Sequence, residues 1–153
     1  MDWHGHSFAF KLRVDVEHLE AQRYVGDYLL TRVSVTNLFD LLAELDVHVS
    51  FCVLGITAEL FPNLIADIVE AGHEIYAHGM YHEPAFEGRP YREQRHEMIR
   101  MGDSIEAACG LKVRGIGCPH HGLADENTLR KRASSMWYRE FEAWGRPSRC
   151  SVV

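Results

Sequence analysis

The sequence lacks several features that would have placed it at once in a functional class. None of its four cysteines forms a Cys-x-x-Cys pair, so neither a zinc knuckle nor a thioredoxin-like redox site is expected. The formal net charge of -6 argues against a general nucleic-acid-binding protein. No apolar run approaches the length of a membrane span, and the first residues lack the basic start and apolar core of a signal peptide. The expected compartment is therefore the cytoplasm.

Internal repeats and low-complexity segments are also absent from the 153 residues, a length that suits one domain with a real core. Apolar residues make up 46% and charged residues 25%, which is ordinary for a globular protein. Histidine is the unusual residue. There are ten, and none follows His121.

Apolar periodicity predicts strands that alternate with helices. Strands are expected at residues 8–16, 47–54, 74–77 and 112–118. Three helices are expected. The first covers residues 31–46, the second has Pro62 in its first turn and Gly72 as its C-cap, and the third covers residues 91–109 and is ended by Gly110. This order predicts βαβ units in a parallel sheet or barrel with about four strands.

Polar side chains that can carry chemistry follow three of these strands. Asp15 and Glu17 end the first, His78 and His82 follow the third, and residues 118–122 follow the fourth. Active sites of α/β barrels and open parallel sheets lie at the carboxyl ends of the strands. We therefore expect these residues to meet at one site.

His78 and His82 are the best candidates for metal ligands. Imidazole binds zinc and similar ions well, and one added carboxylate leaves a coordination position open for water. The ion lowers the pKa of that water from about 16 towards about 7. Asp15 and Glu17 can supply the third ligand and the base that accepts the proton of the water. With ten histidines, a pair at this spacing also arises by chance, and two acids on a strand also suit a solvated face.

Other histidines carry less weight. His96 and Glu97 begin like the helix of a zinc protease, but Arg100 stands where the second histidine belongs. We interpret this segment as a solvated helix face. His73 follows the expected glycine cap, and we expect it to pack or cap rather than bind metal.

Together these residues resemble the motifs of the polysaccharide deacetylase family, NodB-homology hydrolases with a distorted (β/α) barrel. The family's second motif matches the segment from His78 to His82. The first motif is usually two adjacent aspartates, and here it reads Asp15-Val16-Glu17. The resemblance implies that Asp15 is the catalytic base. It also implies that Glu17, His78 and His82 hold a divalent metal ion, with zinc expected.

The third motif normally contains an arginine that helps to hold the catalytic aspartate. Gly117 stands in its place, unless Arg13 or Arg114 reaches the aspartate instead. The same loop supplies the candidate substrate-binding residues Pro119, His120 and His121.

The resemblance implies a domain that is incomplete at its C-terminus. We expect a deacetylase-like domain over residues 1–129 and an atypical basic tail over residues 130–153. A complete barrel usually needs roughly 200 residues or more. The family's late histidine, which acts as general acid, has no counterpart after His121. A truncated or frameshifted chain is expected, with a tail docked on an open sheet edge as the alternative. An open edge also predicts self-association.

The leading functional hypothesis is a metal-dependent hydrolase of non-peptide C–N bonds in carbohydrate metabolism. It would remove acetyl groups from an N-acetylated sugar or polysaccharide, with neither a nucleic-acid partner nor a membrane span. Two alternatives stay open. One is an impaired or inactive remnant that binds metal or glycan, and the other is a hydrolase of another small C–N substrate.

Overall fold

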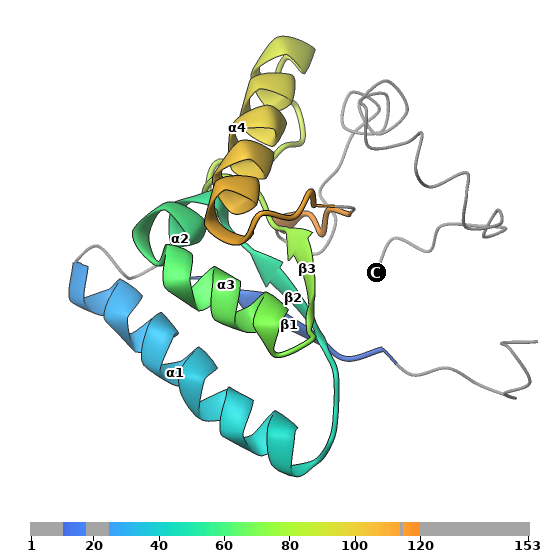
Figure 1. Ribbon diagram of the computed structural model, residues 1–153. Coiled ribbons are helices and arrows are strands. Elements are labelled where there is room, and N and C mark those ends of the chain that lie inside the picture. The colour runs from blue at the N-terminus through green and yellow to red at the C-terminus, as the bar shows by residue number, and fades with distance from the viewer. Residues whose placement is uncertain (1–10, 18–24, 114, 120–153) are drawn as a thin grey trace, which may run out of the picture.

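A small parallel sheet organises the α/β fold (Figure 1). The computed structural model describes residues 11–17, 25–113 and 115–119, with the backbone alone over residues 25–30. The strands are β1 (Arg13–Val16), β2 (Ser50–Val53) and β3 (Glu74–Ala77), and they lie in the order β1-β2-β3. The helices are α1 (Val25–Glu44), α2 (Gly55–Leu60), α3 (Pro62–Glu70) and α4 (Tyr91–Cys109). The prediction of an α/β fold of parallel strands and helices is confirmed.

The core lies where the central strand meets the helices. All four residues of β2 are buried, because β2 pairs with β1 on one side and β3 on the other. Phe51 of β2 is fully buried and meets Phe39 of α1 edge to face, with ring centroids 5.9 Å apart. Ile65 and Ile68 of α3 and Ile105 of α4 are also fully buried.

Two predicted elements match the structure in both bounds, namely the strand at residues 74–77 and the helix at residues 91–109. Gly110 ends that helix in the left-handed conformation, with φ 74°. Helix α1 begins six residues earlier than the predicted start at residue 31. The short helix α2 was not predicted as a separate element. It ends before Pro62 because the residue preceding a proline is driven out of the helical region, and Phe61 has φ -132° and ψ 59°.

The prediction of a fourth strand at residues 112–118 is wrong for the described residues. They form one isolated parallel bridge, between Ala77 and Ile116. The segment therefore lies beside β3, where the next strand was expected, without a continuous ladder. Glycines at positions 115 and 117 weaken a strand here. A Cβ at Gly115 would lie 2.1 Å from the ring of Tyr76, so the backbone is pressed against that ring.

Within the described part of the chain, no helix is both long enough and apolar enough to cross a membrane.

Candidate functional site

Three side chains converge at the carboxyl ends of β1 and β3. Oε2 of Glu17 lies 2.9 Å from Nε2 of His78 and 3.0 Å from Nε2 of His82. We call these three residues the Glu17 cluster. The structure thus brings together the residues predicted as metal ligands, and their binding of a metal ion stays a prediction.

A glycine turn lets both histidines face one point. His78 still continues the ladder, because its N–H donates to the carbonyl of Val53 at 2.9 Å. Gly79 then turns the chain with φ 98°, a conformation that side-chain-bearing residues rarely adopt. A Cβ at Gly79 would also lie 2.8 Å from the carbonyl oxygen of Tyr81. The imidazoles of His78 and His82 end with their centroids 5.9 Å apart. We call residues 78–82 the histidine turn.

The orientation of His78 favours a cation in the cluster. Its Nδ1 lies 2.6 Å from the carbonyl oxygen of Gly117, and since a carbonyl can only accept, Nδ1 carries the proton. Nε2 of a neutral ring then turns its lone pair towards the carboxylate of Glu17. A cation between the two atoms, or a second proton on the ring, removes that repulsion. Metal-bound histidines are commonly held in this way, by a hydrogen bond from the other ring nitrogen.

The size of the cluster also suits zinc. A tetrahedral zinc ion with bonds of about 2.1 Å separates neighbouring ligand atoms by about 3.4 Å. The two observed contacts of Glu17, 2.9 and 3.0 Å, are a few tenths of an ångström shorter. The residues present therefore fit a small divalent cation.

Asp15 lies beside the Glu17 cluster and is held by an arginine. Nη2 of Arg13 donates to Oδ2 of Asp15 at 2.7 Å. Partial burial lowers the pKa of Arg13, but the hydrogen bond to Asp15 and its charge outweigh this and raise the pKa above its ordinary value. The other oxygen, Oδ1, is buried and has no hydrogen-bond partner in the described part of the chain. An acceptor of this kind is suited to take a proton from water.

Arg13 occupies the space next to the glycine of the third motif. A Cβ at Gly117 would lie 3.3 Å from Nη1 of Arg13 and 3.0 Å from Sγ of Cys52. Of the two arginines considered as substitutes, Arg13 reaches Asp15, and Arg114 lies outside the described residues.

Cys52 lies beside Asp15 on the neighbouring strand. The two residues are paired in the register of β1 and β2, and Cys52 is buried as predicted. Burial and then the charge of Asp15 raise the pKa of its thiol to about 12. Ligand atoms of Asp15, Cys52 and His78 also lie within 4.8 Å of one another. A cation there would have to displace the thiol proton of Cys52, whereas the Glu17 cluster offers a carboxylate and two imidazoles.

The predicted substrate-binding residues are only partly described. Pro119 is buried, and its Cγ would lie 3.2 Å from a Cβ at Gly79, so it packs on the histidine turn. His120 and His121 lie outside the described residues, as does the predicted tail at 130–153.

The interpretation of the His96 segment as a solvated helix face is wrong for Glu97. Its side chain is only 12% exposed, and its Oε1 accepts a hydrogen bond from the backbone N–H of Met80 at 3.1 Å. Helical spacing could have revealed the burial of Glu97. It lies three residues after Gln94 and four before Met101, and both of these residues are buried. His96 itself is exposed.

His73 packs as predicted. Its ring lies 5.2 Å from the ring of Phe51 and 5.8 Å from that of Phe39, centroid to centroid.

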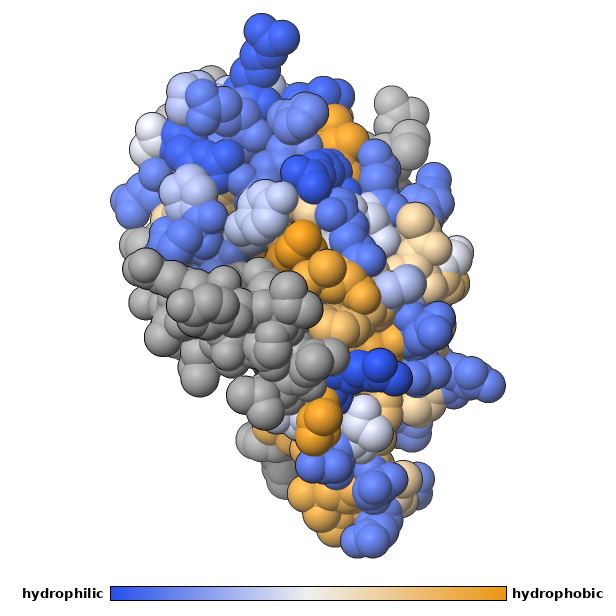
Figure 2. Space-filling view, turned by 90° about the vertical axis from the view of Figure 1, so that its left-hand side faces the viewer, coloured by the Kyte–Doolittle hydropathy of each residue, from blue (hydrophilic) through white to orange (hydrophobic). Residues whose placement is uncertain are grey.

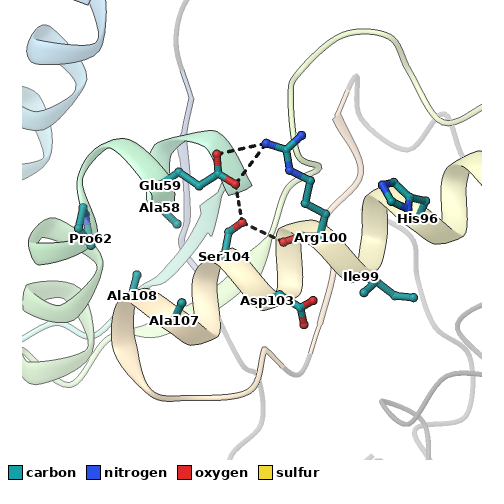
Figure 3. A pocket seen from close by; sticks show the side chains of 10 residues that line it. All are labelled: Ala58, Glu59, Pro62, His96, Ile99, Arg100, Asp103, Ser104, Ala107 and Ala108. Atoms are coloured by element: carbon teal, nitrogen blue, oxygen red, sulfur yellow. Dashed lines mark hydrogen bonds and ion pairs between the residues drawn. The ribbon is translucent and has the colours of Figure 1, made fainter.

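A solvent-open hollow on the helical side of the molecule lies apart from the candidate site. It lies between α2 and α4, has a volume of about 640 Å³ and is open to solvent (Figure 3). Across it, Arg100 and Ser104 of α4 donate to the carboxylate of Glu59, at 3.3 and 2.9 Å. None of its lining residues belongs to the Glu17 cluster.

Comparison with known proteins gives this geometry a family. The sequence profile described as Polysaccharide deacetylase matches residues 27–141. The chain is 29% identical over 127 residues to the chitooligosaccharide deacetylase of Sinorhizobium fredii, which covers 79% of this chain and 58% of that protein. The chain therefore spans little more than half the length of this relative.

Solved structures support the fold. A family 4 carbohydrate esterase from Streptomyces lividans, solved in complex with acetate, is 18% identical with a TM-score of 0.66, covering 80% of this chain and 56% of that one. A CE4 family pseudoenzyme from Bacillus anthracis is 21% identical with a TM-score of 0.63, covering 80% and 39%. The match to the family profile spans most of the sequence, and the chain belongs to the polysaccharide deacetylase family.

Proposed function

We propose that the chain carries the metal site of an N-deacetylase that acts on an N-acetylated sugar or polysaccharide. The observation that carries the proposal is the convergence of the Glu17 cluster, with Asp15 beside it, at the carboxyl edge of the sheet. The name of the Sinorhizobium relative supports the substrate class. The chain spans only 58% of that relative, so the activity of the relative is a proposal for this chain.

In this proposal Glu17, His78 and His82 hold a divalent ion, with zinc as the proposed metal. The bound ion supplies a Lewis acid and makes a water molecule acidic at neutral pH. Asp15 would serve as the general base through Oδ1, since Oδ2 is held by Arg13. His78 keeps its ring in place through the hydrogen bond from Nδ1 to Gly117. Pro119, His120 and His121 are proposed to border the sugar.

A second candidate function is a non-catalytic remnant that binds metal or glycan. One observation favours it: a CE4 family pseudoenzyme from Bacillus anthracis is among the proteins of similar fold. The deacetylase and a metal-binding remnant both predict a metal ion in the Glu17 cluster, and only the deacetylase predicts turnover.

Acetate release from N-acetylated chitooligosaccharides by the zinc-loaded protein separates the two functions. We expect Asp15→Asn to keep zinc binding and to lower the rate about 100-fold or more, because the general base is lost. Asp40→Asn, an exposed carboxylate on α1, is the matched control and should not change the rate. A wild-type protein with one zinc per chain and no acetate release would overturn the deacetylase and favour the remnant.

A further inference from the structure

One ion pair ties the loop that follows β3 to helix α4. Glu97 of α4 accepts the backbone N–H of Met80 at Oε1, and its Oε2 pairs with Nη1 of Arg89. The same Nη1 donates to the carbonyl of Pro84 at 3.3 Å. Glu97 and Arg89 thereby contact the loop at its start, its middle and its end.

The pair is shielded from water and held by its surroundings. The side chains of Glu97 and Arg89 are 12% and 20% exposed, against 60% for Glu93, one turn earlier on α4. Nε2 of Gln94, a fully buried residue, donates to the carbonyl of Arg89 at 2.9 Å. Charge-assisted hydrogen bonds at such low exposure keep most of their strength, whereas exposed ion pairs contribute little.

The contact with Met80 falls in the middle of the histidine turn. Met80 lies two residues from His78 and two from His82. Its carbonyl accepts the N–H of Ile56 at 3.0 Å, so helix α2 holds one side of this residue and Glu97 the other. His78 is also restrained by β2 and Gly117, and the carbonyl of Gly79 accepts the N–H of Gly55 at 2.9 Å. The path from His78 to His82 therefore passes through two residues held by α2, of which Met80 is held by Glu97 as well.

We propose that Glu97 and Arg89 are positioning residues that hold the histidine turn in its ligating conformation and so set the metal affinity of the Glu17 cluster. The inference rests on the proposed metal site. Metal–ligand distances tolerate errors of only about 0.2 Å, so a small shift of Met80 changes how well His82 can bind together with His78. Groups that orient metal ligands without touching the metal typically change affinity 10- to 100-fold when removed.

Zinc affinity, measured by competition with a chromophoric chelator, tests the proposal. We expect Glu97→Ala to weaken zinc binding about tenfold or more. Glu97→Gln should lose less, since its amide oxygen can still accept from Met80, and this variant leaves no cavity that would endanger folding. Glu93→Ala is the matched control, because Glu93 approaches Nε of the same Arg89 at 3.9 Å but has no contact with Met80 among those described.

A role in stability alone makes a different prediction. Removing Glu97 would then lower the melting temperature and leave the affinity of the folded protein at the wild-type value. That result, or equal losses of affinity in Glu93→Ala and Glu97→Ala, would overturn the proposal.

Hydrogen exchange of the metal-free protein tests the same contact without any metal. Peptides that cover residues 78–84 should exchange faster in Glu97→Ala than in the wild type or Glu93→Ala. Unchanged exchange would overturn the inference. If the wild type binds no zinc while this exchange difference is present, the proposed metal site is wrong and the restraint on the turn is still demonstrated.

Discussion

At the residue scale, the candidate site is arranged by atoms that can act only as hydrogen-bond donors or only as acceptors. The carbonyl of Gly117 can only accept, and this fixes which nitrogen of His78 carries a proton. Arg13 can only donate, so Oδ2 of Asp15 is engaged and Oδ1 is left to accept. Glu17, His78 and His82 were predictable, because a short motif and strand ends point to them. Arg13 was one of two options, since the sequence alone does not say which guanidinium reaches Asp15.

Arg13→Ala should lower the rate of acetate release about tenfold or more without weakening zinc binding, because Asp15 loses the hydrogen bond that orients it while the Glu17 cluster is untouched. Lys11→Ala, two residues earlier, removes an equal charge from a residue that pairs with Glu74 at 3.7 Å instead. Steady-state kinetics and zinc titration of both variants check this. Equal rates for the two variants would contradict a specific role for Arg13.

At the scale of elements, apolar periodicity predicted the elements with clear end signals. It failed at a break between two helices and at a segment with weak strand pairing. The strand at residues 74–77 and the helix at residues 91–109 have strong patterns and clear end signals. The break between α2 and α3 depends on Pro62, which also suits the start of a single helix. Residues 112–118 were predicted as a strand, but the ring of Tyr76 and two glycines limit the pairing of the described residues to one bridge.

Where α1, β2 and the start of β3 meet, His73 should make stability depend on pH. Burial and then the neighbouring charge of His48 lower the pKa of His73 below its ordinary value. The unfolded chain then binds a proton more readily, so stability is full above about pH 6.5 and falls as the pH drops through the lower, folded-state pKa. The loss of stability between pH 7 and 5 should be smaller in His73→Phe.

Denaturant midpoints measured across that range test the prediction. His96→Gln, an exposed histidine on α4, is the control and should follow the wild type. A pH dependence that is the same in wild type and His73→Phe would show that other groups carry the effect.

At the scale of the whole molecule, the described sheet is narrow for its family. It has three strands and one further bridge, and in the described part of the chain β1 pairs with β2 alone. Apolar residues also reach the surface, and Figure 2 shows some of them as orange patches among polar residues. Leu12, just before β1, is 43% exposed. The sequence predicted an incomplete barrel, and the three strands of the described sheet and the coverage of 58% of a relative agree with that.

Self-association through this edge is the expected consequence. Sedimentation velocity should show a weight-average mass that rises with concentration. Leu12→Lys should reduce it, because a lysine at a strand edge disfavours pairing with a second chain. Val33→Lys places the same charge on α1, where Val33 is 54% exposed, and should have less effect. A single species of monomer mass at all concentrations would contradict the prediction.

The hydrogen bond from His78 to Gly117 couples two segments that lie far apart in the sequence. If a ligand on Nε2 binds more tightly when Nδ1 is engaged, then by thermodynamic reciprocity the same ligand stabilises the segment that contains Gly117 by an equal free energy. That segment includes Ile116, the one residue of the described ranges that extends the sheet beyond β3. Metal binding at His78 and pairing of the Ile116 segment with β3 would then stabilise each other.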